Sequence, residues 1–108
     1  MITDYSRRAR EAITQFVRTN FHLIGPSTES HLGDIVSAYL GCSGRVSETE
    51  GDNQLRILHN GYPDADLNPL SSLRGVLVQM ANSRDFQGLE DIRAHAYELQ
   101  CRPSIYPH

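Results

Sequence analysis

The side chains of this chain that could do chemistry are arginines, histidines and cysteines, because lysine is absent. Its 108 residues include ten arginines, five histidines and two cysteines, but no lysine. Schiff-base catalysis, a pyridoxal-phosphate linkage and a phosphate-binding loop of the Gly-Lys-Ser/Thr type all require a lysine amine. The composition therefore excludes these three kinds of function.

Metal binding would draw on the histidines and cysteines, and their spacing does not favour it. The cysteines are not spaced as Cys-x-x-Cys, and no two histidines lie three to five residues apart. Cys42 follows a predicted helix end, where the helix dipole disfavours a thiolate, so we interpret it as a half-buried side chain rather than a nucleophile. We predict no metal site and no cofactor; the side chains considered are His22, His31, His59, His95, His108, Cys42 and Cys101.

Length, charge and hydropathy predict one small cytoplasmic domain spanning residues 1–108. The net charge of −3 and the pI near 5.9 argue against a dedicated nucleic-acid binder, which usually carries a basic face. Residues 1–24 lack the apolar region of a signal peptide, and no apolar run approaches the length of a membrane span. We therefore expect reduced thiols, although the sequence leaves open whether Cys42 and Cys101 approach each other.

Apolar periodicity predicts four helices. The first covers residues 4–22 and is ended by Gly25-Pro26, and the second runs from residue 27 or 28 to about residue 40. The third runs from residue 69 to about 81, and the fourth from about 85 to 101, with Phe86 expected to face the core. The tail, about 103–108, is predicted to be irregular.

Between the second and third helices, residues 45–50 and 54–59 are interpreted as a β-hairpin around Gly51-Asp52-Asn53. In the second arm Leu55 and Ile57 alternate with their neighbours, a period typical of a strand. The predicted fold class is therefore α+β, with helices flanking a short antiparallel hairpin in the order αα-ββ-αα. The alternative, a short helix over residues 43–50, stays open.

That alternative matters because residues 33–51 contain Leu40-Gly41 followed closely by Val46-Ser47. This segment resembles the helix-turn-helix of repressor-type DNA-binding proteins, in which one helix ends in Leu-Gly and the next carries Val-Ser. The resemblance implies a recognition helix at residues 44–50, and DNA contacts from Ser43, Arg45 and Ser47.

Two surfaces are candidates for contact with another protein. The first helix carries arginines opposite its apolar stripe, and guanidinium groups make planar, bidentate contacts. The second arm of the hairpin and the turn after it offer a histidine and a tyrosine beside a rigid proline. The predicted contact residues are Arg7, Arg8, Arg18, Arg56, His59 and Tyr62.

The charge is also unevenly distributed. Residues 1–24 have an excess of two positive charges, whereas residues 44–66 have an excess of three negative charges. Such polarity can steer a charged partner or support head-to-tail association. A homodimer formed through an exposed hairpin edge is a further option.

The leading functional prediction is a small non-enzymatic regulatory or accessory protein that binds another protein. Inhibitor, antitoxin-like, immunity and phage or plasmid accessory proteins are of this kind. A helix-turn-helix regulator using residues 33–51 is the alternative, and a nucleic-acid partner is disfavoured by the acidic charge. A small enzyme with His59 and either Asp64 or Asp66 as acid–base groups is the second alternative.

Overall fold

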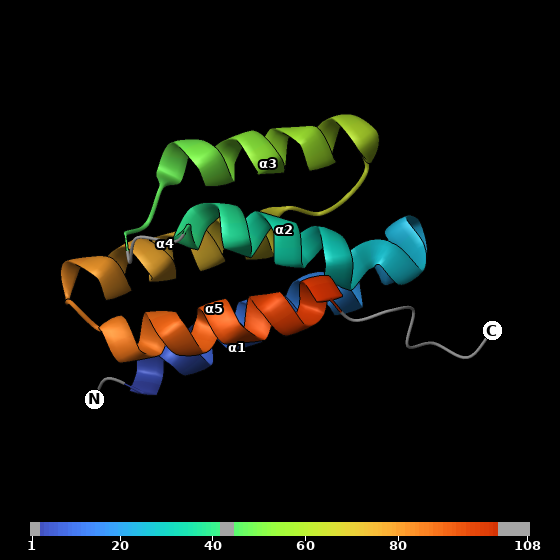
Figure 1. Cartoon of the computed structure of the whole chain (residues 1–108). Coiled ribbons are helices and arrows are strands. Elements are labelled where there is room, and N and C mark those ends of the chain that lie inside the picture. Colours follow the sequence, from blue (N-terminus) through green and yellow to red (C-terminus); the bar gives the residue numbers. More distant parts are fainter. Residues whose placement is uncertain (1–2, 42–44, 102–108) are drawn as a thin grey trace.

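The structure is a computed structural model that describes residues 3–41 and 45–101. Its helices alternate in direction along the chain (Figure 1). α1 packs mainly on α4, α2 packs on α5 and α3, and smaller contacts between the two sets close a four-helix core. The elements are α1 (Thr3–Ile24), the short 3-10 helix η1 (Gly25–Ser27), α2 (Thr28–Leu40), α3 (Glu48–Gly61), α4 (Asn68–Asn82) and α5 (Phe86–Cys101).

The four helices predicted from apolar periodicity are present as α1, α2, α4 and α5, and their ends lie within two residues of the prediction. Gly25 (φ 88°) and Gly41 (φ 57°) follow α1 and α2 in conformations that favour glycine, which explains why these helices stop there. Cys42, Ser43 and the tail 103–108 lie outside the described residues, so the expectations about them are not addressed.

The predicted β-hairpin is wrong, and with it the α+β fold class. Residues 48–61 form α3, and the described part of the chain contains helices and connections but no strand. Ser47 caps α3 by accepting a hydrogen bond from the Glu50 amide at 3.4 Å. The buried Gly51 and Leu58, with the partly buried Leu55, recur at helical spacing. A homodimer through a hairpin edge therefore has no basis in the described residues.

Two glycines on the α2 side allow close packing. A Cβ atom added to Gly33 of α2 would lie 2.8 Å from the backbone nitrogen of Gln100 in α5. A Cβ atom added to Gly51 of α3 would lie 2.0 Å from the ring of Tyr39 in α2. Both contacts require the absence of a side chain, so these glycines set how closely α5 and α3 approach α2.

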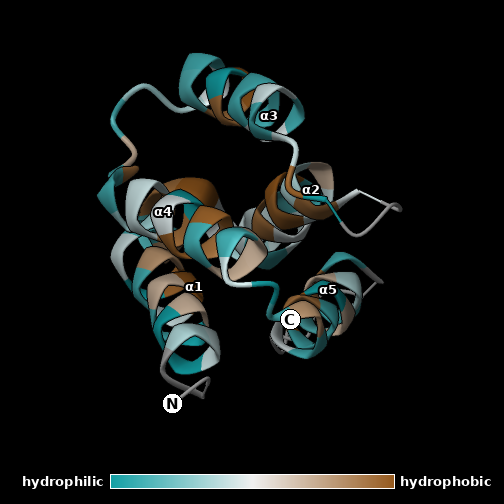
Figure 2. Ribbon diagram, turned by 90° about the vertical axis from the view of Figure 1, so that its left-hand side faces the viewer, coloured by the Kyte–Doolittle hydropathy of each residue, from teal (hydrophilic) through white to brown (hydrophobic). Residues whose placement is uncertain are grey.

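The apolar core lies between the α1–α4 pair and the α2–α5 pair. Phe16, Leu32, Leu77 and Ile92, one from each of these helices, are essentially fully buried. Figure 2 looks along the bundle and shows that α3, outside this core, is largely hydrophilic. Phe86, predicted to face the core, is instead 55% exposed at the first turn of α5. Among the described residues, no helix has both the length and the apolar character needed to cross a membrane.

Candidate protein-binding surface

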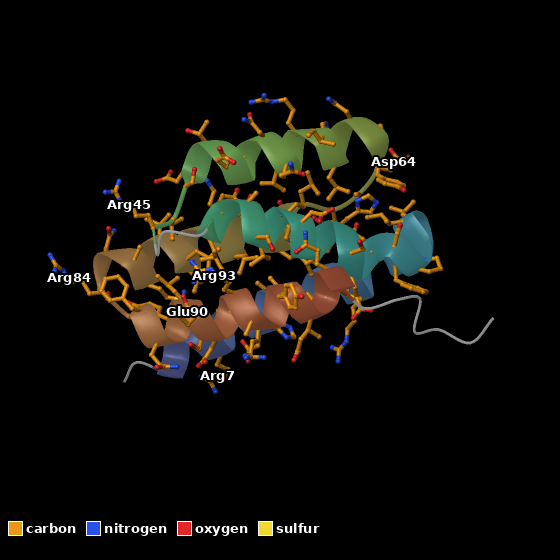
Figure 3. The ribbon with its side chains drawn as sticks, in the orientation of Figure 1. Arg7, Arg45, Asp64, Arg84, Glu90 and Arg93 are labelled. Carbon is orange, nitrogen blue, oxygen red and sulfur yellow. The ribbon has the colours of Figure 1, made fainter. Side chains whose placement is uncertain are left out.

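α1 presents a basic face to solvent. Arg7, Arg8, Arg10 and Arg18 are exposed along it, together with the acidic Glu11. Arg7 and Arg18 are separated by about three helical turns and therefore project from the same side of the helix. Arg7 points away from the bundle in Figure 3. The predicted contact arginines of α1 thus lie on one continuous surface.

A groove of about 610 Å³ lies beside this face, between α1 and α4. The guanidinium carbon of Arg8 lies 5.9 Å from the ring centroid of Tyr5, within the range of a cation–π interaction. The α1 wall therefore combines a positive charge with an aromatic ring. The lining is Tyr5, Arg8, Glu11, Ala12 and Gln15 from α1, and Pro69, Ser71, Ser72, Gly75, Val76 and Gln79 from α4.

Gly75 of this groove differs from the other glycines inside helices. A Cβ atom added to Gly33, Gly51 or Gly88 would lie within 3 Å of another atom, whereas one added to Gly75 would have nothing within 4 Å. A glycine inside a helix costs roughly 0.5–1 kcal/mol relative to alanine. At Gly75, no close contact among the described residues offsets this cost. Without a side chain there, α4 leaves its backbone accessible from the groove.

The residues of the second predicted surface, Arg56, His59 and Tyr62, do not share one exposed surface. Arg56 and His59 are exposed on α3, and Arg56 donates a 3.2 Å hydrogen bond to Asn53. Tyr62 is half-buried, and its ring meets that of His31 edge-on, with 5.7 Å between centroids. Tyr62 thus lines a crevice of about 200 Å³ between α2 and α3 instead of projecting as an anchor.

The residues proposed for DNA contact do not form a recognition helix. α3 begins at Glu48, so Arg45 and Ser47 precede it, and Ser43 is not among the described residues. The expected helix at residues 44–50 is therefore wrong. In addition, α2 and α3 lie alongside each other in opposite directions (Figure 1), whereas the two helices of a helix-turn-helix cross at roughly 90–120°.

The structure does not pair the candidate acid–base groups, which are His59, Asp64 and Asp66. Asp66 lies just before α4, where its Oδ1 accepts a 3.0 Å hydrogen bond from the Asn68 amide. Asp64 is exposed in the preceding turn, and among the described residues neither carboxylate makes a hydrogen bond or ion pair with His59. No group of three or more His, Cys, Asp or Glu side chains in the described ranges could hold a metal ion.

Sequence reasoning missed how α1 is tied to the connection before α4. The buried side chain of Asn20 accepts a hydrogen bond from the Asp66 amide at 2.7 Å, and its Nδ2 donates to the Asp66 carbonyl at 2.9 Å. The same Nδ2 donates to the Phe16 carbonyl at 3.0 Å. This side chain therefore fixes the end of the loop that leads into the groove-lining helix.

A polar network joining α2, α3 and α4 was missed as well. The buried Tyr39 hydroxyl donates to Asp52 at 2.7 Å, and Arg74 donates to both carboxylate oxygens of Asp52, at 3.0 and 3.2 Å, and to Glu48. Hydrogen bonds from Arg74 and Tyr39 hold the pKa of Asp52 below its ordinary value of 3.8. Burial, followed by the Asp52 contact, raises the pKa of Tyr39. The one sequence signal was the spacing of Glu48 and Asp52, four residues apart on a helix.

Arg93 is likewise used within the fold. It donates to the carbonyls of Leu40 and Gly41, at 3.0 and 2.9 Å, and pairs with Glu90 of its own helix (Figure 3). A cation at this position stabilises the C-terminal end of α2, where helix carbonyls lack partners. Arg45 and Arg84 project into solvent at the same end of the bundle (Figure 3).

Comparison with protein-family models, with curated proteins and with solved structures found no match. The surface of the chain itself is therefore the guide to function. Arg74 and Arg93 have structural roles, whereas Arg8 and Gly75 border an open groove. The basic face of α1, together with this groove, is the candidate binding surface.

Proposed function

We propose that the protein is a small regulatory or accessory protein of the cytoplasm that acts by binding another protein. Its partner would place a helix in the α1–α4 groove and direct acidic side chains toward the arginines of α1. The observation that supports this most is Gly75, an open position in the lining of the groove that internal packing does not explain. Amphipathic helices commonly bind in grooves of this kind.

The chemistry of the groove suits a carboxylate-bearing helix. Arg8 can make a bidentate contact with one carboxylate, and Arg7 and Arg18 extend the positive surface along α1. Gly75 and the neighbouring Ser71 and Ser72 have small side chains or none, so a partner backbone can come close to the backbone of α4. Positive charge concentrated on one face of an acidic protein would also steer an acidic partner toward that face.

Affinity capture from the cells that make the protein, read by mass spectrometry, tests this proposal. Wild type should retain one stoichiometric protein partner, and Gly75→Leu and Arg8→Glu should each reduce its recovery by roughly tenfold or more. Gly61→Leu is the matched control, since Gly61 also has open space around it but lies at the end of α3.

Two results would contradict the proposal. One is a partner retained at the wild-type level by folded Gly75→Leu and Arg8→Glu proteins. The other is capture of nucleic acid alone, removed by nuclease, which would favour the DNA-binding alternative. With the partner purified, titration calorimetry at low and high salt should show affinity falling as salt screens the arginines.

A further inference from the structure

An acidic part of the surface lies on the side of the bundle opposite the basic face. Glu48 and Glu50 are exposed at the start of α3 and Asp64 just after its end, with the exposed Arg56 between them. Glu48 is paired with Arg74, so Glu50 and Asp64 are the acids that a second copy would meet. In Figure 1, α3 and α1 lie on opposite sides of the α2 layer, and Figure 2 confirms this along the bundle. Figure 3 shows Arg7 pointing away from one side and Asp64 lying on the other.

The two faces also match in direction and length. Because the helices alternate along the chain, α1 and α3 run the same way (Figure 1). The span from Arg7 to Arg18 is about 16 Å, and the span from Glu50 to the end of α3 is about the same. The Arg7 end of α1 therefore lies at the same end of the bundle as Glu50, and Arg18 lies toward the end that carries Asp64.

We propose that the outer face of α1 binds the α3 face of a second copy of this chain. Moving one copy across the bundle without rotating it would bring Arg7 and Arg10 opposite Glu50, and Arg18 opposite Asp64. The two surfaces in this contact differ, so a pair of copies keeps one unused α1 face and one unused α3 face. Such a head-to-tail contact builds an open stack and not a closed dimer.

The stack has a consequence for the proposed function. The outer face of α1 adjoins the groove through Arg8 and Gln15, so a second copy seated there would hinder a partner from reaching the groove. Self-association and partner binding would then compete. The self-association itself depends on the charged faces and not on the groove, so it stands or fails separately from the proposed function.

The contact should be weak and sensitive to salt. Exposed ion pairs contribute little individually, and salt screens them over a Debye length of about 10 Å at 0.1 M. Sedimentation equilibrium over micromolar to millimolar protein should show the average mass rising with concentration at low salt. The rise should disappear at high salt. A protein that stays monomeric to millimolar concentration at low salt would overturn the proposal without any variant.

Charge reversal tests which faces meet. Arg10→Glu with Arg18→Glu makes both faces acidic, and Glu50→Arg with Asp64→Arg makes both faces basic. Each double variant alone should associate at least about tenfold more weakly than wild type. An equimolar mixture of the two should regain association, because each variant then meets an opposite charge on the other.

Two controls keep the outcome clear. Circular dichroism should show both double variants folded, as expected for substitutions at exposed positions. Gly75→Leu should lose the captured partner but associate with itself as wild type does, which separates this proposal from the proposed function. Wild-type association in either double variant alone, or a mixture that stays dissociated, would refute the head-to-tail contact.

Discussion

Glycine and arginine have different roles on the α2 side of the molecule and on the α1–α4 side. Around α2, Gly33 and Gly51 occupy contacts with no space for a Cβ atom, and Arg93 of α5 is hydrogen bonded to the carbonyls of Leu40 and Gly41. Between α1 and α4, Gly75 faces open space and Arg8 is exposed at the groove wall. Packing within the fold explains the first set, whereas packing among the described residues does not explain the second set, which we propose serves a partner.

This difference shows that an arginine or glycine is informative only once its surroundings are known. The same residue type can stabilise the fold in one place and leave a surface open in another. Substitutions on the α2 side should therefore change stability first. Substitutions in the groove should change binding first.

The largest effect is expected from Gly51→Ala. The added Cβ atom would overlap the buried ring of Tyr39, and α3 would have to move away from α2. We expect a loss of about 2–3 kcal/mol in the free energy of unfolding, measured by urea denaturation. If Gly51→Ala unfolds at the wild-type midpoint, close contact between α3 and α2 is not a source of stability.

A somewhat smaller loss in the free energy of unfolding is expected from Asn20→Ala. This substitution tests the buried face of α1 without changing its basic face. The substitution removes both hydrogen bonds to the backbone of Asp66 and leaves those backbone groups without partners. We expect a loss of about 2 kcal/mol by urea denaturation. Gln15→Ala, on the exposed side of α1, is the control and should unfold close to the wild-type midpoint.

The Asp52 network predicts a pH effect smaller than these two losses. Because the folded-state pKa of Asp52 is lowered, its contribution is present above the ordinary value of 3.8 and is lost as the pH falls through the folded-state value. Asp52→Asn should therefore lower the free energy of unfolding most above about pH 5 and approach the wild-type value at low pH, which flattens the acid side of the stability curve. An unchanged acid limb in urea melts from about pH 2 to 6 would show that the network is not linked to stability.

The smallest effect, and the one opposite in sign, is expected from Gly75→Ala. A methyl group at this position meets no atom within 4 Å, so only the helix-forming preference changes. The free energy of unfolding should rise by roughly 0.5–1 kcal/mol. Gly33→Ala is the matched comparison within α2 and should lower it. A fall in stability for Gly75→Ala would remove the contrast between the two sides.

Local sequence signals were enough for four of the helices but not for α3. The stripe of α1 and the run around Leu77 have the helical period, so their buried faces could be read from the sequence. Gly51-Asp52-Asn53 has the composition of a turn, and this outweighed the capping signal of Ser47 and Glu50. The fold class was wrong because Gly51 is needed for contact with Tyr39, which lies on another helix.

The candidate site was predictable only in part. Exposure of the α1 arginines follows from their place opposite an apolar stripe, and these residues were named from the sequence. The groove is formed by helices about sixty residues apart, so no local pattern indicates it. The sequence alone cannot show that Gly75 faces open space, and so it could not mark Gly75 as part of a binding surface. Tyr62 was expected as an anchor, but its packing on His31 depends on how α3 returns to α2.

Gly75→Leu shows whether the α1–α4 groove is kept open for a partner, because the added side chain would fill space that is otherwise empty. Thermal unfolding and partner capture should be measured on the same preparation, with Gly61→Leu alongside. We expect a folded protein with at least wild-type stability whose recovery of the partner falls by roughly tenfold or more. A folded Gly75→Leu protein that retains the partner at the wild-type level would contradict it.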